Sequence, residues 1–460
     1  MLRLTNSAPL RAIGVGLLLA VAAACGGAPG ADGASGPSPA VQRDQRNLSF
    51  DPLPLYRQMG MIARGQPFPV VGRVGVLPGR SADSSHVVVV LGFAPSALRF
   101  NRETDDRFRA NYTVSITAAR EGTAPVHTTT TESVVVGAFR ETERTDESLL
   151  FQEILDLAPG QYRLTLAIRD VSSQRGIVEE LELEVPDFSR RALAEPLPVN
   201  RIVPRESRES LPYVLARPRA AAALGQDSTI PLYVESTDPA DSVLTLLARG
   251  ESGRLLWQDA VRLEGHAAFA SGVVEVPVQR LGIGVSQVAF VGSNGADTAS
   301  TYVFVGFGDD LPIARFDDML QFLRFFARPA RLQALREAPE EERPAAWTAF
   351  MRETDSIPAT PVNEDLRAYF GRLARANARF REDGVAGWIS DRGRVFVVLG
   401  EPDQIIEPSF TDLSRTRQQV WEYRGRAIQL QFYDQTGAGR WRLTQASESR
   451  FEVELRRQLR

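Results

Sequence analysis

The first long pattern along the chain is an alternation of apolar and polar residues between residues 66 and 187. It is clearest where Tyr162, Leu164, Leu166 and Ile168 are separated by single residues of other kinds. A period of two places every second side chain on one face of a strand, where it can pack against a core. Strands are predicted at 68–76, 86–93, 111–118, 133–139, 149–157, 162–168 and 181–185. This spacing of short strands predicts an immunoglobulin-like β-sandwich.

A second group of apolar and β-branched runs follows a connection at 188–210 that is rich in proline and arginine. These runs lie between residues 211 and 308. Strands are predicted at 229–236, 242–249, 254–263, 273–278, 286–292 and 300–307. We therefore expect a second immunoglobulin-like β-sandwich, which makes the fold class mainly β.

The apolar period changes from two to three and four after residue 312. Amphipathic helices are predicted to begin near Phe316, Pro339 and Asn363, and the first is expected to end near Pro329. Strands are predicted again from Arg394 onward, at 395–400, 419–423, 427–434 and 440–445. Helices followed by a small antiparallel sheet predict a C-terminal α/β domain at 313–460.

The N-terminal segment has the form of a secretory signal peptide. Residues 12–24 are apolar or small, follow two arginines, and are too few to span a bilayer. The step from Ala22 to Cys25 resembles a bacterial lipobox, although Ala22 stands where that motif prefers leucine. The resemblance implies a signal peptide at 1–24, and a lipidated Cys25 with a flexible tether at 25–65. The alternative is an ordinary signal peptide that happens to contain a cysteine.

A lipid on Cys25 would make the membrane the first partner of the protein. We expect the protein in the bacterial cell envelope, anchored by that lipid. Gly26 follows the cysteine where an aspartate would resemble an inner-membrane retention signal, so the outer membrane is expected. An envelope protein is expected as a second partner.

Composition excludes several kinds of chemistry. Cys25 is the only cysteine, so no disulfide can form within the chain. All 53 basic residues are arginine, which excludes Schiff-base chemistry and a P-loop lysine. The three histidines, His86, His127 and His266, are not at metal-ligand spacing, and we predict neither a metal site nor a cofactor. Residues 313–460 carry 24 arginines against 22 acidic residues, which is too balanced to indicate nucleic-acid binding.

The densest block of unusual residues lies at 387–394, with the sequence GWISDRGR, and is followed by Glu401-Pro402-Asp403. This block resembles the GWxTD domain family of bacterial envelope proteins, with Ser390 in place of threonine. Further matching blocks occur in the family's order at 350–355, 363–364, 375–380, 420–423 and 430–432. The resemblance covers about 315–445. It implies an architecture and an envelope location, and no reaction.

Seven residues of this region are candidates for a binding or structural cluster: Trp388, Asp391, Arg392, Arg394, Asp403, Trp421 and Tyr423. One interpretation is structural, because tryptophan anchors a core and aspartate can accept from backbone N–H groups or pair with arginine. The other is a polar and aromatic pocket for a ligand or for a partner's tail. No catalytic motif is present, and no residue is predicted to be catalytic.

The resulting functional hypothesis is a lipid-anchored envelope protein with a non-enzymatic binding or scaffolding role in assembly, secretion or surface organisation. One alternative is an enzyme, or an accessory of one, that acts on envelope polymers through the GWxTD pocket, for example with carboxylates such as Asp391 and Asp403. The other alternative is a lipoprotein that binds glycans or solutes through the loops of its sandwiches.

Overall fold

The computed structural model describes residues 53–460 with the exception of short stretches. The excepted residues are 82, 104–105, 145–148, 204, 206, 208–209, 211–212, 225, 296, 308–314, 361–362, 383–384, 408–416 and 435–436. The predicted signal peptide, Cys25 and most of the tether lie outside the described residues. Within the described part, no helix is long and apolar enough to cross a membrane.

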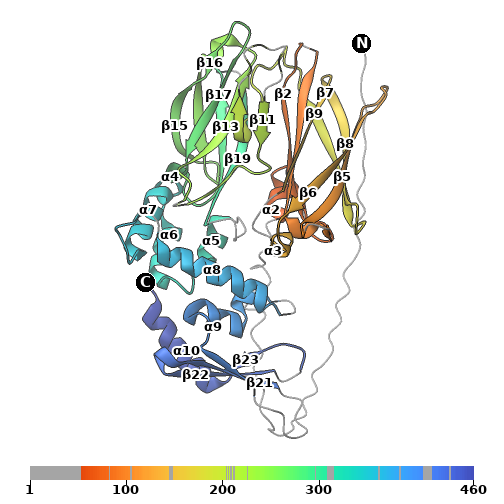
Figure 1. Cartoon of the computed structure of the whole chain (residues 1–460). Helices are drawn as coiled ribbons and strands as arrows, with labels where there is room; N and C mark the ends of the chain where they lie inside the picture. The colour runs from red at the N-terminus through yellow and green to blue at the C-terminus, as the bar shows by residue number, and fades with distance from the viewer. Residues whose placement is uncertain are drawn as a thin grey trace, which may run out of the picture. The chain divides into compact units, whose positions relative to one another are not determined.

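The first β module consists of two antiparallel sheets that share one core (Figure 1). One sheet has the order β1-β2-β3-β7: β1 Ile62–Arg64, β2 Val70–Pro78, β3 Ser85–Phe93 and β7 Leu149–Leu157. The other has the order β4-β5-β8-β9, with β6 on β5: β4 Asn101–Arg102, β5 Phe108–Ala119, β6 Val126–Val136, β8 Gly160–Asp170 and β9 Gly176–Val185. Short helices accompany them: α2 Leu53–Gln58, η1 Pro95–Ala97 and α3 Phe139–Thr142.

The predicted alternation is confirmed in β5 and β8, whose buried and more exposed residues follow one another along most of each strand. The strand predicted at 133–139 is shifted, because β6 begins at Val126 and α3 begins at Phe139. All nine residues of β3 are buried. The second face of this sheet packs on residues of the next module, among them Leu197 and Tyr233. The two modules are therefore in direct contact.

The second β module also contains two sheets. One has the order β11-β10-β13-β17-β16: β10 Leu197–Val203, β11 Tyr213–Ala216, β13 Thr229–Ser236, β16 Glu264–Gly265 and β17 Ala270–Pro277. The other has the order β12-β19-β18-β14-β15: β12 Ala221–Ala223, β14 Val243–Arg249, β15 Leu255–Arg262, β18 Gly284–Val291 and β19 Thr298–Gly306. Helices η2 Pro239–Ser242 and α4 Val278–Leu281 lie between strands. The stretch 188–210, expected as a connection, thus contains β10. The mainly β fold class is confirmed.

A buried ion pair of the second β module contacts the first module. The side chains of Arg205 and Glu235 are both fully buried and form a salt bridge. Arg205 also donates to the carbonyl oxygen of Pro78 at 2.9 Å, at the end of β2. The Tyr233 hydroxyl donates to the other oxygen of Glu235 at 2.7 Å. Charged groups removed from water in this way are tolerated only when they are paired.

The C-terminal part contains helices and a small antiparallel sheet, as predicted. Its helices are α5 Phe316–Phe322, α6 Pro329–Glu337, η3 Glu340–Glu342, α7 Arg343–Thr354, α8 Glu364–Arg379, η4 Gly387–Ile389, α9 Asp391–Leu399, η5 Arg424–Arg426 and α10 Gln445–Gln458. The sheet has the order β20-β21-β22-β23: β20 Gln404–Ile406, β21 Arg417–Tyr423, β22 Ile428–Asp434 and β23 Arg442–Leu443. The helix predicted from Asn363 is confirmed, and the Asn363 side chain accepts from the Leu366 N–H at 2.8 Å as an N-cap.

Three predictions in this part were wrong. Residues 395–400, predicted as a strand, belong to α9, because Ser390 caps the start of a helix and all of 395–399 are buried. A short, fully buried apolar run cannot be assigned to strand or helix by its period alone. The strand predicted at 440–445 is limited to β23, and α10 follows it. The first predicted helix ends at Phe322, and Pro329 instead begins α6, at a position that proline favours.

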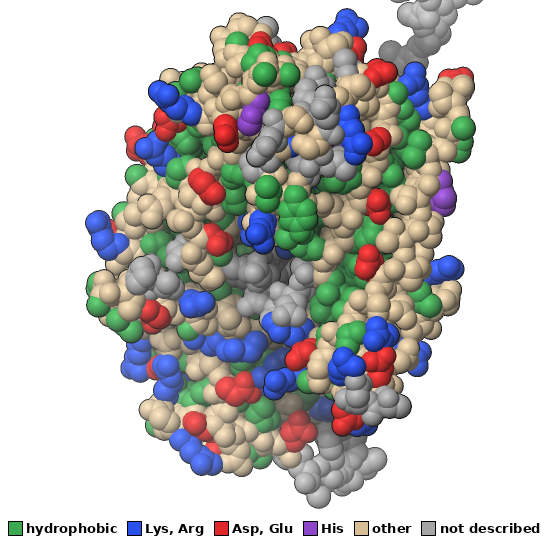
Figure 2. Space-filling view, turned by 45° about the horizontal axis from the view of Figure 1, so that its top comes forward, with side chains coloured by type: hydrophobic (Ala, Val, Ile, Leu, Met, Phe, Trp, Pro, Cys, Tyr) green, Lys and Arg blue, Asp and Glu red, His purple; other side chains and the backbone are tan. Residues whose placement is uncertain are grey.

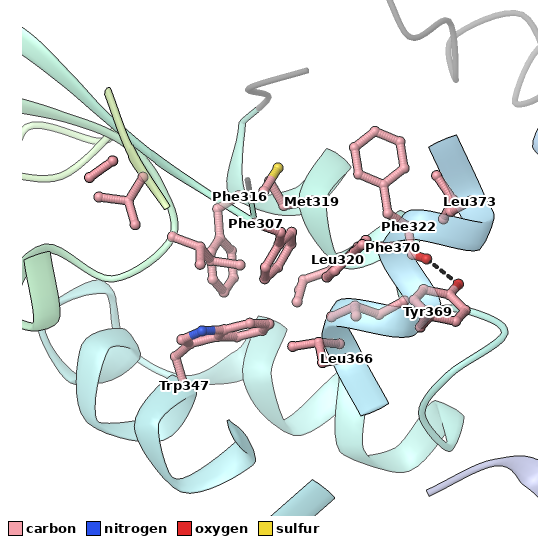
Figure 3. Packing of buried hydrophobic residues seen from close by; sticks show 14 of the residues in the cluster. Phe307, Phe316, Met319, Leu320, Phe322, Trp347, Leu366, Tyr369, Phe370 and Leu373 are labelled. Atoms are coloured by element: carbon pink, nitrogen blue, oxygen red, sulfur yellow. Dashed lines mark hydrogen bonds between the residues drawn. The ribbon is translucent and has the colours of Figure 1, made fainter. Parts of the chain in front are cut away.

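One hydrophobic core joins the second β module to the helices (Figure 3). Phe307, directly after β19, stacks on Phe370 of α8 with ring centroids 4.0 Å apart. It also lies 5.3 Å from the ring of Trp347 in α7. The Tyr369 hydroxyl donates to the carbonyl oxygen of Phe322, which ties α8 to α5. The helical region and the second β module are therefore expected to unfold together.

Candidate functional site

The block at 387–394 forms the turn that begins α9. The Ser390 hydroxyl donates to the Gly387 carbonyl oxygen at 2.7 Å and accepts from the Gly393 N–H at 3.1 Å. This is N-capping, which a threonine hydroxyl can also perform. A Cβ on Gly393 would lie 1.7 Å from the Gly387 oxygen, and one on Gly387 would lie 2.6 Å from the Ala376 oxygen in α8. Both glycines are thus required by close backbone approach.

Trp388 is a core residue. Its side chain has no exposed surface and lies edge-on to Phe322 and Phe325, at centroid distances of 5.6 and 6.0 Å. The Arg324 guanidinium lies over its ring at 5.1 Å. Trp388 therefore anchors the turn before α9 to α5 and to the segment that follows α5.

Asp391 and Arg394 join the start of α9 to the C-terminal strand and helix. Asp391 accepts from the Leu443 N–H at 2.7 Å and lies 3.2 Å from Arg394. Arg394 binds both carboxylate oxygens of Glu448 in α10 and lies 3.7 Å from Glu452. Burial acts to lower the pKa of Arg394, but the hydrogen bond to Glu448 and the charges of Asp391 and Glu448 outweigh burial and raise that pKa. The cluster stabilises the packing of α9 on α10.

Arg392 lies on a different face, between two aromatic rings. Its guanidinium is 4.8 Å from the ring of Trp441 and 5.4 Å from that of Phe380. Burial lowers the pKa of Arg392, and the nearby charge of Glu382 acts in the opposite direction. Phe380 in turn contacts Trp421 of β21 at a centroid distance of 5.5 Å.

The remaining predicted residues belong to the sheet and its first turn. Trp421 is buried and packs on Phe432 at 4.8 Å. The Tyr423 hydroxyl donates to the Gly400 carbonyl oxygen at 3.1 Å, and burial raises the pKa of Tyr423. Asp403 is exposed and accepts from the Arg424 N–H at 2.7 Å.

The structure brings only some of the seven residues together. Asp391 and Arg394 are in contact, and Arg392 is linked to Trp421 through Phe380. Trp388, Asp403 and Tyr423 make their contacts elsewhere, with Phe322, Arg424 and Gly400 respectively. Their geometry is that of a scaffold around α9, and the site described next is lined by none of them.

A pocket of about 450 Å³ lies between α8, α9 and the C-terminal end of α10. Four of its lining residues are arginines: Arg372, Arg426, Arg457 and Arg460. The rest of its wall is formed by further residues of α8 and of the segment at 457–460, and by two other segments, at 325–326 and in α9: Phe325, Phe326, Asp365, Ala368, Tyr369, Val397, Val398, Gln458 and Leu459. We call this the arginine pocket.

Three of the four arginines are matched to carboxylates. Arg460 binds Asp365 at 2.6 Å, and burial, which acts to raise the pKa of Asp365, is outweighed by hydrogen bonds from Ser356 and by Arg460, so this pKa is lowered. Arg457 binds Glu454 at 2.6 Å, and Arg426 lies 3.7 Å from the same carboxylate. Two carboxylates thus serve three guanidinium groups.

Arg372 has no carboxylate partner in an ion pair among the described residues. Its Nε donates to the Val397 carbonyl oxygen at 2.7 Å, which holds the side chain across the pocket from α8 to α9. Burial lowers the pKa of Arg372. The nearby Tyr369 and Asp365 act to raise this pKa, and the charges of Arg375 and Arg426 act to lower it. An arginine stays protonated at neutral pH in spite of such shifts. The pocket therefore has an excess of positive charge and guanidinium N–H donors for an oxyanion.

Sequence reasoning missed this pocket because its arginines come from three segments that are far apart in the chain. The one available signal was in α8, where Asp365, Tyr369 and Arg372 recur at spacings of four and three and so share a face. Arg457 lies in the last turn of α10, and Arg460 lies just after this helix. The apolar pattern did not predict α10, so these two arginines could not be placed. Within the described residues, no group of three His, Cys, Asp or Glu side chains is placed to hold a metal ion.

Comparison with known families supports the resemblance found in the sequence. The model of the GWxTD domain matches residues 290–450, so this part of the chain is a GWxTD domain. The match begins within β18 and includes β19 and Phe307. Phe307 follows the second β module and packs on Phe370 of the helices. No curated protein matches the chain.

Solved structures similar to the chain are distant. They include the BSP domain of a biofilm-associated protein, at 8% identity and a TM-score of 0.16, covering 58% of this chain and 54% of that one. A β-glucuronidase from Ruminococcus gnavus matches at 8% identity and a TM-score of 0.16, covering 55% and 41%. A β-glucuronidase from Bifidobacterium dentium matches at 11% identity and a TM-score of 0.18, covering 53% of this chain and 44% of that one. The chain thus spans about half or less of these proteins, and nothing about its function follows from them.

Proposed function

We propose that the protein is a lipid-anchored, non-enzymatic binding or scaffolding protein of the bacterial envelope, and that its GWxTD domain holds a partner by an anionic group in the arginine pocket. The observation that carries this proposal is the state of Arg372. It is half-buried, held in place by Val397, and without a carboxylate in an ion pair among the described residues.

The chemistry of guanidinium groups supports an oxyanion as the bound group. Arginine presents a planar fork of N–H donors that matches carboxylate and phosphate oxygens, and such charge-assisted bonds are stronger than neutral ones. The side chain of Arg426 is also held by a hydrogen bond within the protein. With its amide turned to satisfy both neighbours, Gln458 accepts from Arg426 at 2.6 Å and donates to the Val398 carbonyl oxygen at 2.8 Å. The donors are therefore held before any ligand arrives, which lowers the entropy cost of binding.

We expect Arg372→Gln to weaken partner binding about tenfold, or about 1.4 kcal/mol, because one charge-assisted contact is lost. The measurement is recovery of partner from detergent-solubilised envelope by the tagged full chain. The matched control is Arg367→Gln, an exposed arginine on the same helix. Inorganic phosphate should release the partner at a lower concentration than chloride of equal ionic strength. Equal recovery with the two variants, or equal release by the two salts, would contradict the role of the pocket.

The anchoring part of the proposal rests on Cys25. We expect Cys25→Ala to move the protein from the membrane fraction to the soluble fraction, because a thiol is needed for acylation. Fractionation of the wild type should place it with outer-membrane markers. A Cys25→Ala protein that remains membrane-bound would contradict the lipid anchor, and recovery of the wild type only with inner-membrane markers would contradict the outer-membrane location.

A further inference from the structure

We propose that strand β6 of the first β module is a self-association edge, which pairs antiparallel with β6 of a second copy of the chain. This inference is independent of the arginine pocket. It rests on the length, regularity and low charge of the Val126–Val136 edge, and on a register in which two copies of it pair without opposed like charges.

The edge is long and regular. β6 pairs with β5 over its whole length, from Phe108 opposite Val136 to Ala118 opposite Val126, without a shift of register. Among the described strands, β5 is the only one that pairs with it. A strand of this length extends over about 37 Å and leaves every second residue's N–H and C=O unpaired along its outer side.

The devices that usually protect such an edge are missing from β6. Natural edges carry charges, prolines or bulges that prevent pairing with other chains. β6 contains no proline, no bulge and a single carboxylate, Glu132. β9, at the opposite edge of the same sheet, carries four glutamates: Glu179, Glu180, Glu182 and Glu184. In Figure 2 the right-hand side of the molecule, where β5 and β6 lie, shows mainly uncharged side chains.

The strand β7 of the other sheet contacts the second β module through a side chain. The Gln152 side chain donates to the Val214 carbonyl oxygen at 2.6 Å and accepts from the Ala216 N–H at 2.9 Å. The amide of Gln152 thus satisfies two backbone groups of β11. Among the described residues, β6 makes no hydrogen bond with the second β module, and Thr130 donates to Glu153 of β7 at 3.1 Å, within the first module.

The sequence of β6 suits pairing with itself. The one antiparallel register that uses all of Val126–Val136 places Thr131 opposite its own copy on a two-fold axis. Glu132 then faces Thr130, His127 faces Val135, and Val126 faces Val136, so no like charges oppose each other. A two-fold interface of this kind uses the same strand on both molecules. This register makes a second copy the occupant that the edge fits.

On the solvent-exposed face of β5 and β6, hydroxyl side chains already bond to one another across the two strands, and the same kind of contact would continue across the two-fold axis. Thr131 bonds Thr113 at 3.3 Å, and Thr129 bonds Ser115 at 2.9 Å, in rows of hydroxyls that run across β5 and β6. In the proposed dimer Thr129 faces Ser133 of the second copy and extends the same row. One strand pair buries less surface than a standard interface of about 1,600 Å². We therefore expect a weak dimer that dissociates on dilution.

The test is sedimentation velocity of the full chain in detergent over a wide concentration range. The wild type is expected to shift from the mass of a monomer to that of a dimer. Thr131→Lys places two ammonium groups opposite each other at the axis and should raise the dissociation constant at least tenfold. Val178→Lys on β9, where Val178 is 61% exposed, is the matched control and should behave as the wild type. A second variant, Thr131→Cys, should form an intermolecular disulfide on mild oxidation, while Val178→Cys should not.

Each outcome decides the proposal. A wild type that stays monomeric at every concentration overturns it. A dimer that persists unchanged in Thr131→Lys, or that forms without a Thr131→Cys cross-link, places the interface elsewhere and also overturns it. Circular dichroism of each variant shows whether the monomer is folded, since Thr131 is exposed and its replacement should leave the fold intact.

Discussion

Replacement of Trp388 by alanine is expected to lower the free energy of unfolding by about 3–5 kcal/mol, the range found when a fully buried aromatic side chain is truncated. Trp388 has no exposed surface and fills the space between Phe322, Phe325 and Arg324. The alanine variant leaves a cavity that the close approach of Gly387 to α8 prevents the backbone from closing. The unit that loses stability is the second β module together with the helices, because they share one core.

The measurement is urea unfolding followed by circular dichroism, with Ile405→Ala as control. Ile405 is 42% exposed on β20, so its truncation should change the free energy of unfolding by less than about 0.5 kcal/mol. A Trp388→Ala protein that keeps wild-type stability but loses its partner would contradict the structural role and favour a binding role for this residue.

The second large effect is expected at the buried ion pair of Arg205 and Glu235. Replacement of Glu235 by leucine alone should lower the free energy of unfolding by about 3–5 kcal/mol, because it leaves the Arg205 charge buried without its carboxylate. It also removes the acceptor of the Tyr233 hydroxyl. Replacement of both residues, Arg205→Met with Glu235→Leu, should recover much of that loss, since an apolar pair avoids the desolvation of two charges.

Thermal unfolding of the two single variants and the double variant forms a cycle that measures this coupling. The exposed pair of Arg163 and Glu182, at 3.6 Å, is the control and should contribute less than about 1 kcal/mol. Single costs that simply add in the double variant would contradict the view that the uncompensated charge is what destabilises the protein.

Most of the β architecture could be predicted because its signal is local. The alternation from Tyr162 to Ile168 reports which face of β8 is buried, and the turn residues between runs report where strands end. The N-cap at Asn363 was predictable for the same reason, since the cap bonds a backbone N–H three residues away. Neither inference needs knowledge of a distant partner.

The apolar run at 395–399 could not be assigned in this way. When every side chain is buried, the run has no polar face, and its period carries no information. Ser390 decides the outcome as an N-cap whose hydroxyl also donates to the Gly387 carbonyl oxygen, and the Gly387 N–H in turn donates to Asn377 of α8. The candidate cluster failed to form one pocket for a related reason. Asp391 and Arg394 find their partners, Leu443 and Glu448, about 50 residues further along the chain.

By itself, the sequence determined most strands of the two β modules, the helix that begins after Asn363, the GWxTD block and the chemistry excluded by a single cysteine and the lack of lysine, because these depend on residue types and on spacings within a few residues. Only the tertiary structure decided which charges are paired. It placed Glu454 beside Arg426 and Arg457, Asp365 beside Arg460, and left Arg372 with a carbonyl oxygen instead of a carboxylate. It also decided that β9 and β6 are the two outer strands of one sheet. β9 carries four glutamates, and β6 carries one carboxylate. Ion pairing and strand order depend on distances between segments remote in the chain, and these distances exist only once the core has formed.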